Sequence, residues 1–151
     1  MHILFALKTL YHNLYLKKVP KIRIMADADI KTTVEETNKD YVEDGKNKLN
    51  VKCKFCSSKI LDKQSANYIT QEKQLPLMQQ DNNREEGEIQ TESVNEFYHV
   101  ENMYTFENIG FTHSVDNYKY LSCADCDAGP VGYYDMNTKH SYVALSRVVH
   151  S

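Results

Sequence analysis

The chain has 151 residues, of which 41% are hydrophobic and 26% charged, and its formal net charge is -3. This length allows one domain with a modest core, and the charge balance excludes the strongly basic surface of a dedicated nucleic-acid binder. No stretch reaches the roughly 18 consecutive apolar residues that a membrane span needs, so we expect no stable membrane insertion.

Residues 1–24 form a basic extension with five lysine or arginine residues and no acidic residue, which gives them a net charge of +5. The extension makes a poor secretory signal because its apolar run covers only residues 3–7. Three interpretations stay open: a mitochondrial presequence, a helix on a membrane surface, or a segment upstream of a working start at Met25. Without a secretory signal, we expect a cytoplasmic protein.

The middle of the chain alternates between polar and β-rich segments. Residues 25–48 are polar and predict a flexible lead-in. Residues 49–61 predict a strand, a turn and a second strand, and "LPLM" at 75–78 is typical of a buried anchor. Residues 79–95 are rich in charged residues and predict a mobile surface loop.

The C-terminal part predicts a three-stranded meander with strands over 118–123, 131–134 and 141–150. The last strand carries apolar residues on both faces, which indicates a central position in the sheet. Upstream of the meander, three large residues are expected in the core: Phe106, Ile109 and Phe111. Residues 49–151 are therefore predicted to form a single, mainly β domain.

All four cysteines lie in two C-x-x-C pairs, Cys53 with Cys56 and Cys123 with Cys126. Four thiolates complete a tetrahedral Zn²⁺ shell, and two residues between ligands let one turn present both sulfurs to the same ion. Since 66 residues (57–122) separate the pairs, the site would clamp an N-terminal hairpin onto the C-terminal meander. A closed shell of four cysteines leaves no open position for water, so the zinc would be structural.

Other interpretations of the cysteines stay open. A thioredoxin-like redox pair lies at a strand-to-helix junction, whereas strand patterns flank both pairs here. The cysteines could also be unconnected core residues, and the spacing alone does not distinguish zinc from iron.

Asp125 lies between the second pair of cysteines, where metal coordination does not require a carboxylate. It is either a turn residue that bonds its own backbone or an acidic contact for a basic group on a partner. Met103 and Tyr104 follow the predicted loop and are either buried or exposed as interface anchors.

The phosphate-binding, zinc-protease and nucleophile-elbow motifs do not occur in the sequence, and the six histidines are scattered. No Ser/His/Asp or Cys/His catalytic set stands out either. A reductase that binds zinc through two C-x-x-C pairs would need a further cysteine as nucleophile, and the chain has only four. A zinc ribbon that binds nucleic acid would need a basic face, which the acidic balance after residue 24 opposes.

Several strings resemble the Rab-interacting-factor family, also called Mss-four: "CKFCSSKIL", "LPLM", "VENMYTFENIGFT", "YLSCADCDAGPVGYY" and "YVALSRVVH". They occur in the family's order and cover most of residues 49–150. The resemblance implies a β-tent fold with one structural zinc held by two hairpins. It also implies a monomer that binds the nucleotide-free form of Rab GTPases in vesicle transport and promotes GDP release, as an exchange factor or a chaperone.

The resemblance also implies the residues that contact the GTPase. The acidic residue between the second pair of cysteines corresponds to Asp125. The family's acidic-Met-aromatic triplet corresponds to Asn102, Met103 and Tyr104, so this chain has asparagine where the family has aspartate, and Glu101 could supply the missing charge. The first 45 or so residues and the loop at 79–95 have no counterpart in the family's pattern.

Overall fold

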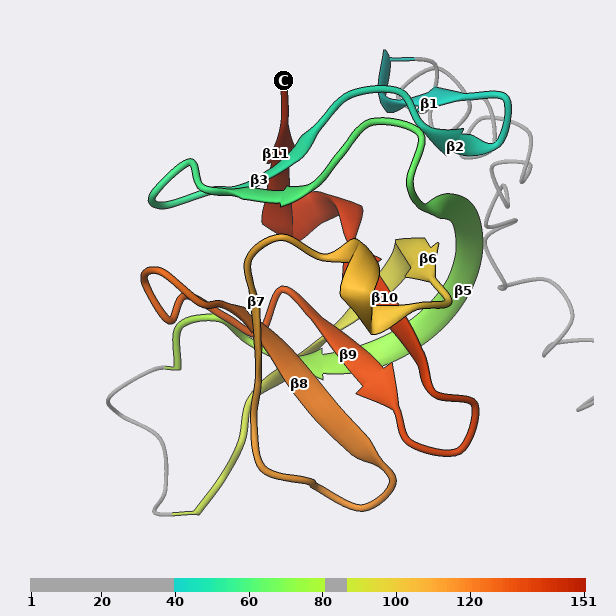
Figure 1. Cartoon of the computed structure of the whole chain (residues 1–151). Helices are drawn as coiled ribbons and strands as arrows, with labels where there is room; N and C mark the ends of the chain where they lie inside the picture. The colour runs from blue at the N-terminus through green and yellow to red at the C-terminus, as the bar shows by residue number, and fades with distance from the viewer. Residues whose placement is uncertain (1–39, 81–86) are drawn as a thin grey trace, which may run out of the picture. The chain divides into compact units, whose positions relative to one another are not determined.

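The computed structural model describes residues 40–80 and 87–151. These residues form two antiparallel sheets and two short 3-10 helices, which confirms the predicted mainly β class (Figure 1). The expectations for residues 1–24, for most of the lead-in and for the centre of the 79–95 loop lie outside the described residues. Within the described ranges, no helix has both the length and the apolar character needed to cross a membrane.

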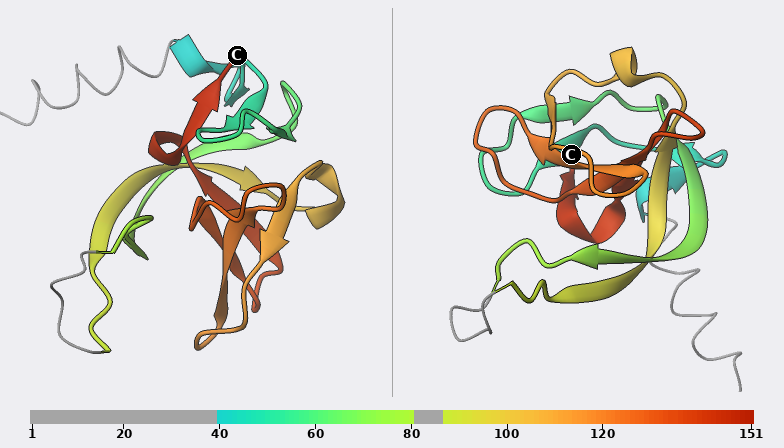
Figure 2. Two further views of the ribbon diagram at one scale, coloured as in Figure 1. Left: turned by 90° about the vertical axis from the view of Figure 1, so that its left-hand side faces the viewer. Right: turned by 90° about the horizontal axis from the view of Figure 1, so that it is seen from below.

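The larger sheet has eight strands in the order β1-β2-β5-β6-β10-β9-β8-β7. Their bounds are β1 Val42–Glu43, β2 Lys46–Asn47, β5 Asn67–Pro76, β6 Thr91–Val100, β7 Ile109–Phe111, β8 Tyr118–Cys123, β9 Gly132–Asp135 and β10 His140–Ala144. The hairpin of β5 and β6 is long and strongly curved (Figure 2), and its register shifts between Thr70 and Lys73. Such an irregularity bends a strand and increases its twist.

The smaller sheet has three strands in the order β11-β3-β4, with β3 at Val51–Cys53, β4 at Lys59–Leu61 and β11 at Val148–His150. The predicted hairpin over 49–61 is confirmed as β3 and β4. The predicted strand over 141–150 is wrong as a continuous strand, because the 3-10 helix η2 (Leu145–Arg147) interrupts it. The chain leaves the larger sheet at Ala144 and enters the smaller sheet at Val148.

Two other boundaries also differ from the prediction. Residues 42–48 do not belong to a flexible lead-in, because β1 and β2 pair there and Asn47 is fully buried. The Asn47 side chain donates to the carbonyls of Leu49 and Asp62 and accepts from two backbone amides, those of Ser65 and Ala66. Residues 91–95 belong to β6 and not to a loop.

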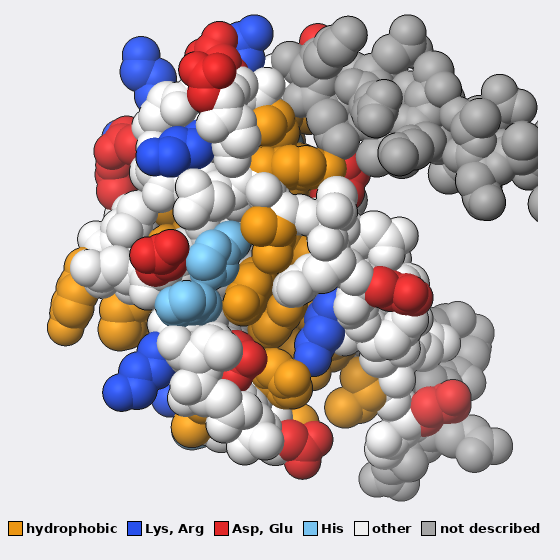
Figure 3. Space-filling view, turned by 90° about the vertical axis from the view of Figure 1, so that its right-hand side faces the viewer, with side chains coloured by type: hydrophobic (Ala, Val, Ile, Leu, Met, Phe, Trp, Pro, Cys, Tyr) orange, Lys and Arg blue, Asp and Glu red, His pale blue; other side chains and the backbone are white. Residues whose placement is uncertain are grey.

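Alternate residues of the larger sheet face two different clusters. On one face, Phe97, Tyr133 and Ala144 pack with Leu75 and Val94. Figure 3 shows hydrophobic side chains gathered in a strip on one face of the molecule, with histidine side chains next to them. This surface stays partly exposed, since the residues packed against the cluster are only half-buried.

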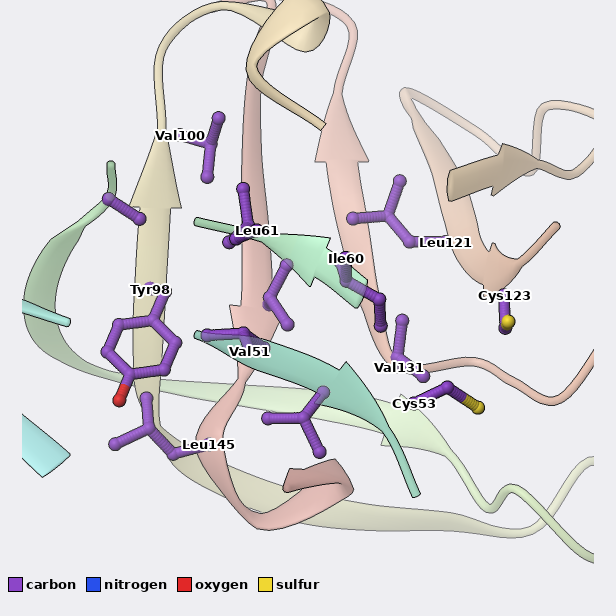
Figure 4. Packing of buried hydrophobic residues seen from close by; sticks show 13 residues of the cluster. Val51, Cys53, Ile60, Leu61, Tyr98, Val100, Leu121, Cys123, Val131 and Leu145 are labelled. Atoms are coloured by element: carbon purple, nitrogen blue, oxygen red, sulfur yellow. The ribbon is translucent and has the colours of Figure 1, made fainter. Parts of the chain in front are cut away.

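On its other face, the larger sheet packs against the smaller sheet and forms the main core (Figure 4). Val51, Ile60 and Leu61 of the smaller sheet lie among Tyr98, Val100 and Leu121 of the larger one, and all six are at most 2% exposed. Figure 4 places Cys53 and Cys123 at one end of this core. Phe106, Ile109 and Phe111 pack against the cluster but are only partly buried, because they belong to the segment that covers its edge.

Candidate metal centre and the adjoining surface

The two C-x-x-C turns, here called knuckle 1 (53–58) and knuckle 2 (123–128), have the same backbone construction. In knuckle 1 the first cysteine accepts from the amide of Ser57 at 3.0 Å and donates to the carbonyl of Ser58 at 2.8 Å. Knuckle 2 repeats both bonds, at 2.9 Å each, with Asp127 and Ala128. Ser57 and Asp127 have φ values of 62° and 57°. Each turn therefore presents its two sulfurs in the same direction.

The fold brings the four cysteine sulfurs within 4.8 Å of one another. Across the knuckles, Cys53 Sγ lies 3.6 Å from Cys126 Sγ, and Cys56 Sγ lies 3.5 Å from Cys123 Sγ. Four sulfurs bound at about 2.3 Å to a tetrahedral ion would lie about 3.8 Å apart, so the four residues fit a metal ion. Unconnected core cysteines are thereby excluded.

The thiols of this cluster differ in their acidity. Hydrogen bonds from the hydroxyl and the backbone of Ser58 lower the pKa of the Cys56 thiol to about 6. The backbone amide of Ala128 lowers the pKa of Cys126, but burial and the three neighbouring thiols outweigh it and raise that pKa to about 12. A metal ion would have to displace the remaining thiol protons, since only thiolates are ligands.

The cluster joins the two sheets. Knuckle 1 connects β3 to β4 in the smaller sheet, and knuckle 2 follows β8 in the larger one, and both turns lie at the same end of the molecule (Figure 1). A metal ion bound here would close a contact between residues 67 to 73 positions apart. The predicted clamp of the hairpin onto the meander agrees with this geometry.

Asp125 is exposed at the tip of knuckle 2, and its Oδ2 accepts a hydrogen bond from the hydroxyl of Ser58 in knuckle 1. Within the part of the chain that the structure describes, the partner of the Asp125 carboxylate is Ser58 of the other knuckle and not the backbone of its own turn. The carboxylate links the two knuckles on the solvent side of the cysteine cluster. The sequence did not predict a role for Ser58, because no local pattern indicates that its hydroxyl lies next to Asp125.

The segment 101–104 lies on the surface between β6 and β7. The Oδ1 of Asn102 accepts from the amide of Tyr104 at 3.0 Å, which caps the 3-10 helix η1 (Met103–Thr105). Met103 is 44% exposed and Tyr104 87% exposed, so neither side chain is buried. Glu101 is exposed as well.

The residues that follow η1 connect this segment to β4 and to knuckle 2. The amide of Glu107 donates to the carbonyl of Ile60 in β4 at 3.0 Å, and its carboxylate forms an ion pair with Lys59 at 2.7 Å. Asn108 Nδ2 donates to Cys123 Sγ at 3.4 Å. Sequence reasoning assigned no role to Glu107 or Asn108, although both lie in the quoted string "VENMYTFENIGFT".

Together, the fold and the site define a small β protein with four cysteines that fit a metal ion at the junction of two sheets, and with Met103 and Tyr104 exposed on a segment that Asn108 links to this cluster. The protein-family model described as "Mss4 protein" matches residues 46–150 of this chain. The chain belongs to the Mss4 family.

Curated relatives agree with this assignment. A Drosophila melanogaster protein named as a guanine nucleotide exchange factor MSS4 homolog is 47% identical over 118 residues, which cover 78% of this chain and 97% of the relative. A Schizosaccharomyces pombe protein with the same name is 24% identical over 98 residues, which cover 64% of this chain and 91% of the relative.

Proposed function

We propose that this chain binds the nucleotide-free form of Rab-type small GTPases and promotes GDP release, as an exchange factor or a chaperone in vesicle transport. The relatives named as exchange factors support activity on a small GTPase. The observation that carries the proposal is the exposed pair Met103 and Tyr104, on a segment that Asn108 links to Cys123 of the cysteine cluster.

Release of GDP would follow from binding alone. A protein that binds the empty GTPase more tightly than the loaded one weakens nucleotide binding by the same factor, because the two equilibria are linked. Met103 and Tyr104 would enter an apolar seam of the GTPase, and Asp125 would face the basic groups that otherwise contact phosphate. No bond of the nucleotide is made or broken.

We also propose that the metal is a single structural Zn²⁺ held by Cys53, Cys56, Cys123 and Cys126. Four thiolates suit zinc, and a closed shell contributes folding energy and rigidity. Iron uses the same donor set, and elemental analysis of the purified protein distinguishes the two. The protein would act as a cytoplasmic monomer that reaches membranes transiently through its GTPase.

A second candidate function is that of a β-tent interaction module without exchange activity. Asn102 favours it, because the chain lacks the negative charge that the family resemblance implies at this position. Binding of an empty GTPase without faster GDP release would select this alternative.

Asp125→Lys tests the proposed contact. We expect this charge reversal to lower affinity for a nucleotide-free Rab by more than about tenfold, since it places a cation opposite basic groups. Affinity is measured by titrating each variant into the stripped GTPase. Ser58→Ala is the matched control, because it removes the hydrogen bond to Asp125 but keeps the carboxylate.

The control should bind like the wild type, and both variants should retain their metal. Wild-type affinity in Asp125→Lys would remove Asp125 from the site. A loss of binding in both variants would instead indicate that Asp125 acts only by joining the knuckles.

A further inference from the structure

Phe55 occupies the same position in knuckle 1 that Asp125 occupies in knuckle 2. Each is the third residue of its C-x-x-C motif and comes directly before the second cysteine. The amide of Phe55 donates to Cys53 Sγ at 3.4 Å, and the amide of Asp125 likewise bonds Cys123. Both side chains are exposed. Because the four sulfurs form one cluster, these two side chains belong to the same end of the molecule.

Phe55 is also unusual in its exposure. Its side chain is 57% exposed, although the ring is large and apolar and the turn that carries it is tightly hydrogen-bonded. An aromatic side chain on a rigid turn loses little conformational entropy on binding, and such residues often dominate interface energies. Packing does not require a phenylalanine at an exposed turn position.

The surroundings of Phe55 carry positive charge. Lys54 is exposed next to it, and Lys52 lies half-buried on β3. Within residues 40–80 and 87–151, neither lysine forms an ion pair, whereas Lys59 of the same hairpin has two partners, Asp62 and Glu107. A complementary surface would therefore present an apolar recess bordered by acidic groups.

We propose that Phe55 is an apolar anchor of the GTPase-binding surface, which would extend from Met103 and Tyr104 across Asp125 to knuckle 1. This inference rests on the proposed function and adds a residue that determines affinity and partner choice. The occupant would be the GTPase, because Phe55 lies in knuckle 1, and Ser58 of the same knuckle donates a hydrogen bond to Asp125. A carboxylate at this place opposes an anionic lipid surface, which the lysines alone would suit.

The test is a titration of full-length variants into the stripped Rab GTPase that the wild type binds most tightly. Phe55→Ser is expected to weaken binding by about tenfold or more, as for other buried aromatic anchors, and Phe55→Leu to weaken it less. Val115→Ser is the matched control, because Val115 is 50% exposed. It lies in the β7–β8 turn, at the end of these strands away from Cys123. Metal content and urea midpoint confirm that each variant is folded.

Normal binding by Val115→Ser with weak binding by Phe55→Ser supports the inference. Wild-type affinity in Phe55→Ser, together with lost binding in Asp125→Lys, would overturn the role of Phe55 and leave the proposed function standing. No binding by the wild type to any stripped Rab would overturn both. A Phe55→Ser protein that binds the GTPase normally but no longer sediments with phosphatidylserine vesicles would assign Phe55 to a lipid surface, against the inference.

Discussion

Asn102 retains one of the two roles that an aspartate would have at its position. Its side-chain oxygen caps η1 through the amide of Tyr104 at 3.0 Å, and either an asparagine or an aspartate can form this bond. The negative charge is the part that this chain lacks. The conformation that exposes Met103 and Tyr104 is therefore kept, while the electrostatic attraction to the proposed GTPase would be weaker than with an aspartate.

Substitutions at Asn102 separate these two roles. Asn102→Asp should raise affinity for the stripped GTPase by up to about tenfold through the added charge. Asn102→Ala should lower it, because the lost cap costs about 1 kcal/mol of local stability. Both effects are measured by titration and by the rate of fluorescent GDP release. If both variants matched the wild type, residue 102 would lie outside the contact.

At the scale of elements, the close pairing of β9 with β10 depends on Gly132. A Cβ at this position would lie 1.9 Å from the backbone oxygen of Tyr142, in the register where Gly132 pairs with Val143. Because backbone atoms cannot move aside as a side chain can, the two strands would have to separate. The meander that leads from knuckle 2 into the sheet would lose its register.

Gly132→Ala should therefore destabilise the fold by about 3 kcal/mol or more, or yield insoluble protein. Gly110→Ala on β7 is the control. Its Cβ would lie 3.1 Å from the hydroxyl of Ser122, which can rotate, and 3.8 Å from the Ser122 backbone oxygen, an ordinary van der Waals distance. Urea unfolding of the two variants measures the difference. Equal midpoints for Gly132→Ala and the wild type would contradict the described register.

Local patterns predict only part of this arrangement. The hairpin at 49–61 and the strands of the meander could be predicted, because alternation and turn residues are local signals. The break in the last strand at Leu145–Arg147 could not be predicted. Apolar residues on both faces are typical of a central strand, and they are equally typical of a segment that crosses from one sheet to another. The ordered structure around Asn47 could not be predicted either. Four hydrogen bonds stabilise this polar side chain in the interior, and hydropathy gives no sign of them.

The candidate site likewise contains residues that the sequence predicts and residues that it does not. The four cysteines could be predicted as ligands from composition and spacing, whereas the proposed GTPase contacts follow from the family resemblance. The bonds from Ser58 to Asp125 and from Asn108 to Cys123 join segments 67 and 15 residues apart. Only the packing of the two sheets brings these groups together.

For the whole molecule, a metal ion in the four-cysteine cluster would link stability to the proposed interface. The cluster joins the two sheets at one end of the core, and Asn108 connects it to the segment that follows Met103 and Tyr104. Loss of the metal would leave four thiols in one cluster, with no ion to hold the knuckles together. Folding and GTPase binding are therefore expected to fail together.

Removal of the metal with a strong chelator should lower stability by about 3 kcal/mol or more, which corresponds to a melting temperature about 10 °C lower or more. Thermal unfolding of metal-loaded and chelated protein measures this change, and Cys126→Ser should reproduce it without chelator. An unchanged melting temperature in protein shown to be metal-free would contradict a structural role for the ion.

The most direct test of the central claim compares the affinity of the full chain for Rab GTPases stripped of nucleotide and loaded with GDP. We predict binding to at least one stripped Rab that is about 100-fold tighter than to its GDP form, with dissociation of the complex when GDP or GTP is added. Equal affinity for both forms, or no binding by folded, metal-loaded protein to any stripped Rab, would contradict the proposed function.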